Sequence, residues 1–261
     1  MFPYFVLFEQ THYTYPLIGL AGLFIAVSVA YIRAKRVGIS YFDMTLSIVF
    51  LGLGIVVGGA VFHALVQSPV LWSYRTYFFD NPLLFLRAAF GGLVFYGGLV
   101  GALATMPLYA KIIKQDLSTL FALFIPVFPL AHGIMRIGCF MAGCCYGVEC
   151  DILGVAFIRS LAAPNDVNLL PVQLFESVAN FLVFAILWRY TSKSREPLKV
   201  FCFYGLSYAV IRFMLEFLRG DEARGFIFIF SVSQFISILV ALFCVCGLIF
   251  RNPQNKVFYQ S

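Results

Sequence analysis

Seven long apolar segments occupy most of this chain and decide what it can fold into. A helix needs about 20 mostly apolar residues to cross a membrane, and stretches of this kind alternate with charged or turn residues. The predicted spans cover roughly residues 15–32, 44–66, 91–110, 119–139, 172–190, 200–218 and 228–250. We therefore predict an all-α polytopic membrane protein of about seven transmembrane helices, forming one integral domain over residues 1–261.

The composition excludes the soluble classes of protein. Hydrophobic residues make up 62% of the chain and charged residues only 11%, whereas about 25% of residues are charged in a soluble domain. The first 16 residues lack the basic region and the small-residue cleavage site of a removable signal peptide. We expect them, and the aromatic segment 71–80, to lie along the membrane interface, where aromatic side chains gather.

Lysine and arginine are distributed unevenly between the two ends of the spans. One side holds Arg33, Lys35, Arg36, Lys111, Lys114, Arg189, Lys193, Arg195, Lys199, Arg251 and Lys256. The other side holds only Arg75, Arg87, Arg159, Arg219 and Arg224. Because cytoplasmic loops carry the excess of basic residues, we place the N-terminus outside and the C-terminus in the cytoplasm. The net charge of +6 follows from this bias, and we expect no nucleic-acid partner.

Two arginines, Arg136 and Arg212, lie at membrane depth. In span 119–139, His132 and Arg136 are four residues apart and Cys139 follows three later, so the three share one helix face. A charge at this depth costs about 2.5 to 3.5 kcal/mol on insertion scales, so such a face points at a cavity or a partner.

Span 200–218 carries a second polar stripe at helical spacing, which also runs to the outer end. It consists of Tyr208, Arg212, Glu216 and Arg219. A purely structural explanation has Arg212 paired with Glu216, Arg136 snorkelling outward and His132 donating to a backbone carbonyl. Two arginine stripes that approach one leaflet favour a ligand, because guanidinium grips phosphate bidentately. The sequence therefore predicts a site for an outer-leaflet phospholipid headgroup.

Two further segments carry candidate site residues. In FGGLVFYGG, close helix packing explains the glycines, but Tyr96, beside Gly97 and Gly98, would have unusual access to any groove that they open. In PVQLFE, Gln173 and Glu176 occupy the first turns of span 172–190. The helix dipole favours a glutamate there, so Glu176 also has a structural explanation.

The seven cysteines are too scattered for a disulfide scaffold. Cys202, Cys244 and Cys246 lie in spans, where a thiol is usually a small core residue. At or beyond the outer membrane surface lie Cys144, Cys145 and Cys150, whose pairing or freedom the sequence leaves open.

A metal site built from His132, Cys139, Cys144 and Cys145 is one alternative, since soft ligands of this kind suit zinc or copper. Their spacing fits no standard zinc pattern, and adjacent cysteines are awkwardly placed to hold one ion. We expect neither a metal nor an organic cofactor.

Five segments, taken in order, resemble the prolipoprotein diacylglyceryl transferase family over about residues 15–245. They are GGLVFYGG, HGIMRIGCFMAGCCYG, PVQLFE, YGLSYAVIRFMLEFLRGDEARG and SVSQFIS. The resemblance implies transfer of the diacylglyceryl group of phosphatidylglycerol to the lipobox cysteine of a prolipoprotein signal peptide. A thioether forms and glycerol phosphate is released, in a bacterial inner or plasma membrane with membrane lipids as neighbours.

The resemblance also implies roles for individual residues. Arg136 and Gly147 match the essential arginine and closing glycine of the family signature, and Tyr15 matches a family tyrosine. The expected catalytic residues are Arg136, Arg212, Tyr96, His132 and Tyr208. The expected substrate-binding residues are Gly97, Gly98, Cys139, Gly147, Gln173, Glu176, Glu216, Arg219 and Tyr15.

The chain departs from the family pattern at several positions. The family signature usually has asparagine where Cys139 and Ala142 stand, glutamate at Cys144, and histidine at Tyr96. The general base therefore stays open between Tyr96, whose ordinary pKa is about 10, and His132, at about 6.5.

The departures also keep two other functions open. One is a related phospholipid-dependent transferase with another acceptor. The other is a lipid-binding or transport protein that keeps the anion site without the chemistry. Transporters often show inverted repeats with broken helices at the bilayer midplane, whereas the polar residues here crowd toward one leaflet.

Overall fold

A computed structural model describes residues 2–113, 116–160, 162–193, 196–221, 226–227 and 229–250. Two compact units make up the chain. The larger comprises Met1–Arg33 and Phe121–Ser261, and the smaller comprises Ala34–Leu120. That the two act as one membrane domain stays a prediction.

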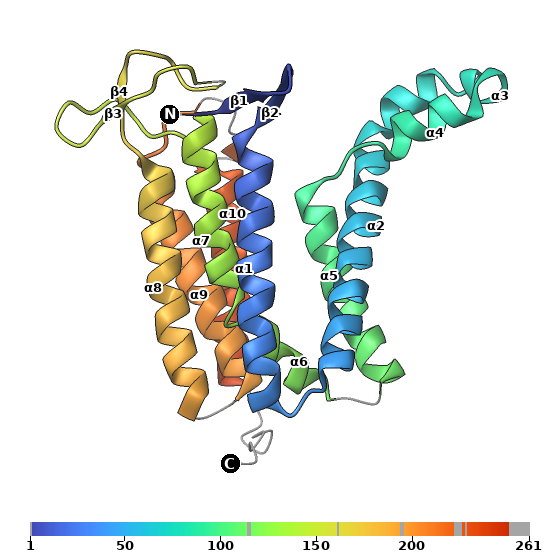
Figure 1. Cartoon of the computed structure of the whole chain (residues 1–261), viewed down its shortest axis with the longest axis vertical. Coiled ribbons are helices and arrows are strands. Elements are labelled where there is room, and N and C mark those ends of the chain that lie inside the picture. Colours follow the sequence, from blue (N-terminus) through green and yellow to red (C-terminus); the bar gives the residue numbers. More distant parts are fainter. Residues whose placement is uncertain are drawn as a thin grey trace. The chain divides into compact units, whose positions relative to one another are not determined.

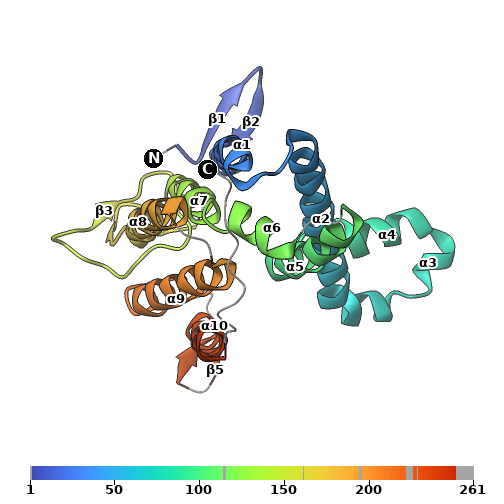
Figure 2. The same ribbon diagram turned by 90° about the horizontal axis from the view of Figure 1, so that it is seen from below.

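The larger unit is built on long helices that lie side by side (Figure 1). They are α1 (Thr14–Val37), α7 (Phe128–Ala142), α8 (Val172–Lys193), α9 (Pro197–Glu216) and α10 (Val232–Ile249). Figure 2 shows α7, α8, α9 and α10 following one another in an arc, each beside the next. Apolar side chains pack α8 against α9, with Val183, Leu187 and Val200 all buried. The outward faces stay apolar and exposed, as a helix in lipid requires.

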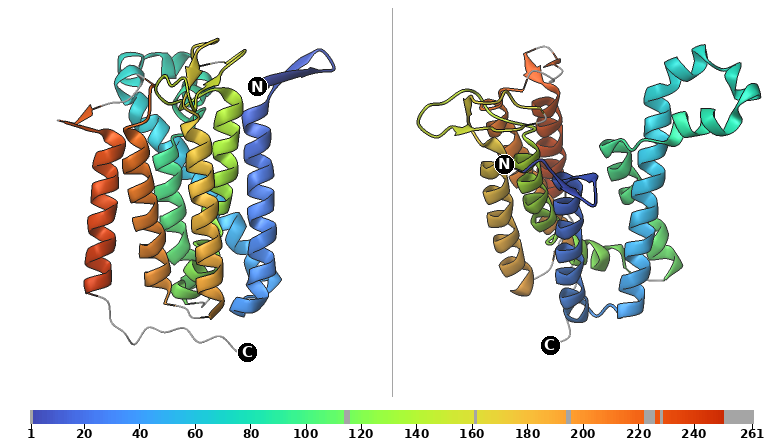
Figure 3. Two further views of the ribbon diagram at one scale, coloured as in Figure 1. Left: turned by 90° about the vertical axis from the view of Figure 1, so that its left-hand side faces the viewer. Right: turned by 45° about the horizontal axis from the view of Figure 1, so that its top comes forward.

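Short hairpins lie at one end of the larger unit (Figure 3). The antiparallel pairs are β1 (Tyr4–Leu7) with β2 (Gln10–Tyr13), β3 (Val155–Ala156) with β4 (Asn168–Leu169), and β5 (Phe226–Ile227) with β6 (Phe230–Ser231). The N-terminal segment, one of the two expected along the interface, thus contains a hairpin with exposed Phe5, Val6, Leu7 and Phe8. The hairpins are too small to change the fold class, and the chain is a mostly helical, multi-pass membrane protein.

The smaller unit consists mainly of two packed helices. Its elements are α2 (Tyr41–Ser73), α3 (Tyr77–Asp80), α4 (Pro82–Phe90) and α5 (Phe95–Ile112). Small residues allow α2 and α5 to approach closely, since a Cβ on Gly58 or Gly101 would collide with the facing backbone. The hydroxyl of Tyr109 donates to the backbone oxygen of Asp43 at 2.6 Å, which ties the two helices together.

Six helices in the described residues are long and apolar enough to cross a membrane. They are Thr14–Val37, Tyr41–Ser73, Leu117–Ala142, Val172–Thr191, Leu198–Glu216 and Val232–Ile249. The remaining predicted span is α5, which is helical over 18 residues. The expected span 119–139 contains α6 (Leu117–Phe124) and α7, and Pro126 and Pro129 mark the interruption because proline lacks the N–H of a continuing helix. The count of seven and the orientation stay predictions.

Candidate active site

Three side chains of α7 form one polar face, as their spacing predicts. Nε of Arg136 donates to Nε2 of His132 at 3.3 Å, and Nη1 of Arg136 lies 4.0 Å from Sγ of Cys139. The pattern i, i+4, i+7 places these groups one above another along the helix. The prediction of a shared face is confirmed.

A buried glutamate of α8 meets this face. Oε1 of Glu176 lies 2.9 Å from Nη2 of Arg136 and 3.5 Å from Nε2 of His132. The Glu176 side chain is only 2% exposed. Helix α8 reaches this position because Ser177 donates to the backbone oxygen of Gly133 at 2.7 Å. The purely structural explanation, in which Arg136 snorkels outward, is therefore wrong on this point, because the Glu176 carboxylate holds the guanidinium inside.

Helix α9 supplies a second arginine held by a second carboxylate. Nη2 of Arg212 lies 2.7 Å from Oε2 of Glu216 and donates to Oγ of Ser233 on α10 at 2.8 Å. The predicted Arg212–Glu216 pair is confirmed. A capping box between Ser231 and Gln234 starts α10 and so positions Ser233.

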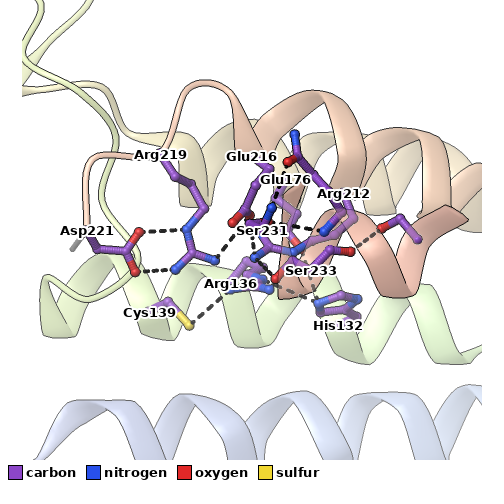
Figure 4. A network of polar contacts seen from close by, with 12 residues as sticks. His132, Arg136, Cys139, Glu176, Arg212, Glu216, Arg219, Asp221, Ser231 and Ser233 are labelled. Atoms are coloured by element: carbon purple, nitrogen blue, oxygen red, sulfur yellow. Dashed lines mark hydrogen bonds and ion pairs between the residues drawn. The ribbon is translucent and has the colours of Figure 1, made fainter. Parts of the chain in front are cut away.

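Each of these arginines is bound through Nη2 and keeps Nη1 largely uncommitted. Nη1 of Arg212 is buried and has no hydrogen-bond partner within the described part of the chain. Nη1 of Arg136 has only the sulfur of Cys139, at 4.0 Å. Figure 4 shows Arg136 and Arg212 converging on one region from α7 and α9. Because buried donors are nearly always paired, two guanidinium N–H groups are available here to an anion.

His132 keeps a free ring nitrogen next to this pair. The described residues provide no hydrogen-bond partner for its buried Nδ1, so the expected donation to a backbone carbonyl is not found. The ring lies 5.3 Å from that of Tyr208, which stacks in turn on Tyr204 at 6.3 Å. The predicted neighbours His132, Arg136, Tyr208 and Arg212 are thus brought together.

Arg219 lies just beyond α9, at the edge of the same cluster. Its guanidinium pairs with Asp221, and Nη1 is 3.9 Å from Oε2 of Glu216. Burial alone would lower the pKa of Arg219, but the hydrogen bond to Asp221 and nearby acidic groups raise it overall. Three arginines therefore face three carboxylates, so the cluster offers an anion oriented donors rather than excess positive charge.

The loop after α7 is fastened to the site by its backbone. Gly147 N–H donates to the backbone oxygen of Leu170 at 2.9 Å, and Gly147 also bridges to Arg219. A Cβ on Gly147 would collide with Leu170 and Val172. Gly147 therefore permits a close approach of three segments.

Gln173 and Tyr15 support the loop and α7. Nε2 of Gln173 donates to the backbone oxygen of Cys144 at 2.7 Å, while its buried Oε1 finds no partner among the described residues. The Tyr15 ring packs on Gly138, where a Cβ would lie 3.3 Å from Cδ2 of Tyr15. Both residues therefore reach the neighbourhood of Arg136.

The pKa values of Cys144 and Cys145, in the turn after α7, are shifted in opposite directions. Thiol hydrogen bonds with Cys139 and Cys144, aided by Arg219 and Arg136, lower the pKa of Cys145 well below its usual range. Hydrogen bonding of the Cys144 thiol to Cys139 and Cys145 raises the pKa of Cys144.

The candidates on α5 belong to the smaller unit. Gly97 and Gly98 are buried, and a Cβ on either would meet Phe62 or Ile55 of α2. Their contacts match the helix-packing explanation, and a role in substrate binding stays a prediction. The Tyr96 side chain falls outside the described residues.

Ser233 and Asp221, which fix Arg212 and Arg219, are site residues that the sequence did not single out. The Ser-x-x-Gln capping box at residues 231–234 was a visible signal for a helix start at Ser231. Only the fold reveals that the turn it builds faces Arg212.

Comparisons with known proteins show which family this chain belongs to. The family model described as prolipoprotein diacylglyceryl transferase matches residues 4–250. A phosphatidylglycerol–prolipoprotein diacylglyceryl transferase of Clostridium tetani is 34% identical over 241 residues, covering 91% of this chain and 92% of the relative. Its counterpart numbered 2 in Clostridium perfringens is 34% identical, covering 77% of this chain and 75% of the relative. The Marinomonas enzyme of the same name is 30% identical, with coverages of 80% and 74%. This chain belongs to the prolipoprotein diacylglyceryl transferase family.

Proposed function

We propose that this chain transfers the diacylglyceryl group of phosphatidylglycerol to the thiol of a lipobox cysteine in a prolipoprotein signal peptide, in a bacterial cell membrane. The bond that breaks joins the phosphate oxygen to the glycerol carbon of the diacylglyceryl group. The bond that forms joins that carbon to the cysteine sulfur. Glycerol phosphate leaves with the bonding electrons, and the thiol proton passes to a base.

One observation carries this proposal: Arg136 and Arg212 converge from two helices, each oriented by its own buried glutamate and each with Nη1 to spare. Negative charge grows on the phosphate as its ester bond breaks. Donors that are already oriented stabilise that charge without reorganising, which is the most effective form of electrostatic catalysis. Both arginines would contact the departing phosphate.

The carboxylates make this arrangement tolerable within a membrane. Glu176 and Glu216 neutralise the two arginines before the lipid arrives, so no uncompensated charge is buried. Arg219, at the edge of the cluster, would guide the anionic headgroup inward. Its pairing with Asp221 keeps it outside the phosphate contacts assigned to Arg136 and Arg212.

His132 and Tyr96 are the two candidates for the base. Nε2 of His132 accepts from Arg136, so in the neutral ring Nδ1 carries the hydrogen. His132 would therefore take the thiol proton at Nε2, once Arg136 has turned from the ring to the phosphate. Tyr96 would need a cation beside it to lower its ordinary pKa of about 10. Full transfer by Tyr96→Phe together with loss of transfer by His132→Ala would assign the base to His132, and the reverse pattern would assign it to Tyr96.

The function is tested by incubating the purified full chain with phosphatidylglycerol and a lipobox peptide, and measuring the molecular mass of the peptide product. The expected product carries one diacylglyceryl group in thioether linkage. A peptide with serine in place of the lipobox cysteine is the matched control and should stay unmodified. Absence of any adduct, with phosphatidylglycerol still bound, would favour the lipid-binding alternative. Rescue of a bacterium depleted of its own transferase extends the test to cells.

A further inference from the structure

Three cysteine sulfurs meet at the C-terminal end of α7. Sγ atoms of Cys139, Cys144 and Cys145 all lie within 4.8 Å of one another. Cys139 is buried in the last turn of the helix, and the other two are partly buried in the turn that follows. Neither His132 nor any other described histidine, cysteine or carboxylate shares this cluster. The arrangement is therefore a pure trio of thiols.

The backbone explains how adjacent cysteines come to face one point. Gly143 has φ +76°, which ends α7 and folds the chain back, so that the Cys144 N–H donates to the Cys139 oxygen at 3.1 Å. Cys145 has φ +59°, a left-handed conformation that is uncommon for a residue with a Cβ. The expectation that adjacent cysteines are awkwardly placed for one ion is thus wrong, because this turn brings both sulfurs to the same side.

Contacts outside the trio hold the turn in this shape. The Gln173 side chain, on α8, donates to the backbone oxygen of Cys144 at 2.7 Å. The backbone N–H of Gly147 donates to the backbone oxygen of Leu170, next to β4. The Ser160 hydroxyl, on the next loop, donates to the Gly143 oxygen at 3.4 Å. Contacts with the rest of the fold therefore hold the turn, and the thiol hydrogen bonds within the trio add to them.

The geometry suits an ion better than a disulfide. A disulfide joins two sulfurs and leaves the third over, whereas one ion uses all three. Zinc–sulfur bonds of about 2.3 Å place the sulfurs of a tetrahedral site roughly 3.8 Å apart, so a small contraction of this trio is sufficient.

Charge balance also favours a bound cation. Binding of a divalent ion releases three thiol protons to solvent and leaves three thiolates around it, with a net charge of −1. Nη1 of Arg136 lies 4.0 Å from Sγ of Cys139, so the positive guanidinium would offset that negative charge.

We propose that Cys139, Cys144 and Cys145 form a binding site for a thiophilic d10 cation such as Zn²⁺. An ion held there converts Cys139 into a permanent thiolate beside Arg136 and draws Nη1 toward sulfur. Nη1 of Arg136 is then lost to the lipid phosphate, so occupancy lowers transferase activity. This consequence, unlike the binding itself, rests on the proposed function.

Cadmium alone is the probe for binding, because cadmium–thiolate bonds absorb in the ultraviolet. The reduced, chelator-treated full chain should bind one Cd²⁺, which should shield these three cysteines from alkylation as mapped by mass. Loss of a residue that merely supports a metal ligand lowers metal affinity roughly tenfold or more. Loss of a ligand should cost at least as much, so Cys139→Ser, Cys144→Ser and Cys145→Ser should each lower the affinity for Cd²⁺ by at least that factor.

Three controls separate the trio from ordinary thiols. Cys150→Ser removes a thiol from the same loop, Cys246→Ser removes an exposed one, and a Cys202→Ser/Cys244→Ser double variant removes a neighbouring pair elsewhere. All three should bind cadmium like the wild type. The proposal would be overturned if the controls lost cadmium binding to the same extent, or if a variant with all three of Cys139, Cys144 and Cys145 changed to serine bound cadmium fully. Either result would mean adventitious binding to thiols. A disulfide among the three in protein taken from membranes without reductant would also overturn the proposal.

Transfer activity provides the second readout. Zn²⁺ should inhibit the wild type reversibly and spare the Cys145→Ser variant, each compared with its own uninhibited rate. If cadmium binds but zinc does not inhibit, the metal site stands, and the claim that a bound ion draws Arg136 away from the phosphate is overturned. If wild-type transfer is absent while cadmium binds, the proposed function fails and the metal site stands.

Discussion

Nη2 of Arg136 on α7 lies 2.9 Å from Oε1 of Glu176 on α8, and both side chains are largely buried. The pair joins two helices and also fixes the direction of the guanidinium. Removing one member of a buried pair costs about 3 to 5 kcal/mol, because the other charge is left without compensation. Stability and the orientation of Arg136 therefore depend on the same contact.

Glu176→Ala should lower the free energy of unfolding by about 3 to 5 kcal/mol. In detergent, the variant should therefore melt at a clearly lower temperature than the wild type. Glu196→Ala is the matched control, since Glu196 pairs with Lys199 at a more exposed position on the same unit. A partly exposed pair between neighbouring turns of one helix is worth about 1 kcal/mol or less. Equal melting shifts in the two variants would contradict the structural role assigned to Glu176.

Ser233→Ala should lower kcat roughly ten- to hundredfold, because a hydrogen bond to a charged group contributes about 1.5 to 3 kcal/mol and here holds Arg212 in place. Ser233→Thr keeps the hydroxyl and should restore most of the rate. Ser237→Ala, one turn further along α10, removes a hydroxyl that donates to the backbone oxygen of Ser233 at 2.8 Å and leaves the Ser233 hydroxyl in place, so kcat should stay nearly unchanged. If Ser237→Ala is as slow as Ser233→Ala, Ser233 has no special positioning role.

Arg212→Lys should reduce transfer roughly a hundredfold or more, although the charge is kept. A single ammonium group cannot pair with Glu216 and also present a second nitrogen to a phosphate, as a guanidinium fork does. Arg87→Lys, at an exposed position in the smaller unit, is the control. Comparable rates for the two variants would show that charge alone suffices at position 212.

Gly147→Ala should destabilise the protein by about 1 to 3 kcal/mol, because its Cβ has no room beside Leu170 and Val172. Gly19→Ala tests the same chemical change in α1, where nothing lies within 4 Å of the added atom. That variant should be neutral or slightly stabilising, since alanine is the better helix former. Thermal melting of the two proteins checks this, and an unchanged midpoint for Gly147→Ala would refute the close-approach argument.

Helical spacing made part of this site predictable. His132, Arg136 and Cys139 had to share a face once their segment was helical, and the same holds for Arg212 and Glu216. The fold class was equally accessible, because long apolar segments permit few alternatives in a membrane.

Partners contributed by other helices could not be predicted in the same way. That Glu176 meets Arg136 rather than serving only the start of α8 depends on how α7 packs on α8. The contact of Ser233 with Arg212 depends likewise on the turn before α10. The convergence of three thiols depends on left-handed backbone at Cys145, a conformation that its sequence does not demand.

The central claim is that Arg136 and Arg212 together hold the phosphate of the departing group. It is tested most directly by single-turnover formation of the diacylglyceryl peptide by Arg136→Ala and Arg212→Ala, with melting curves to establish that each variant is folded and Arg87→Ala as control. The account predicts that each variant loses at least about a hundred- to a thousandfold in rate while Arg87→Ala keeps the wild-type rate. Near-normal turnover by either folded variant would contradict it.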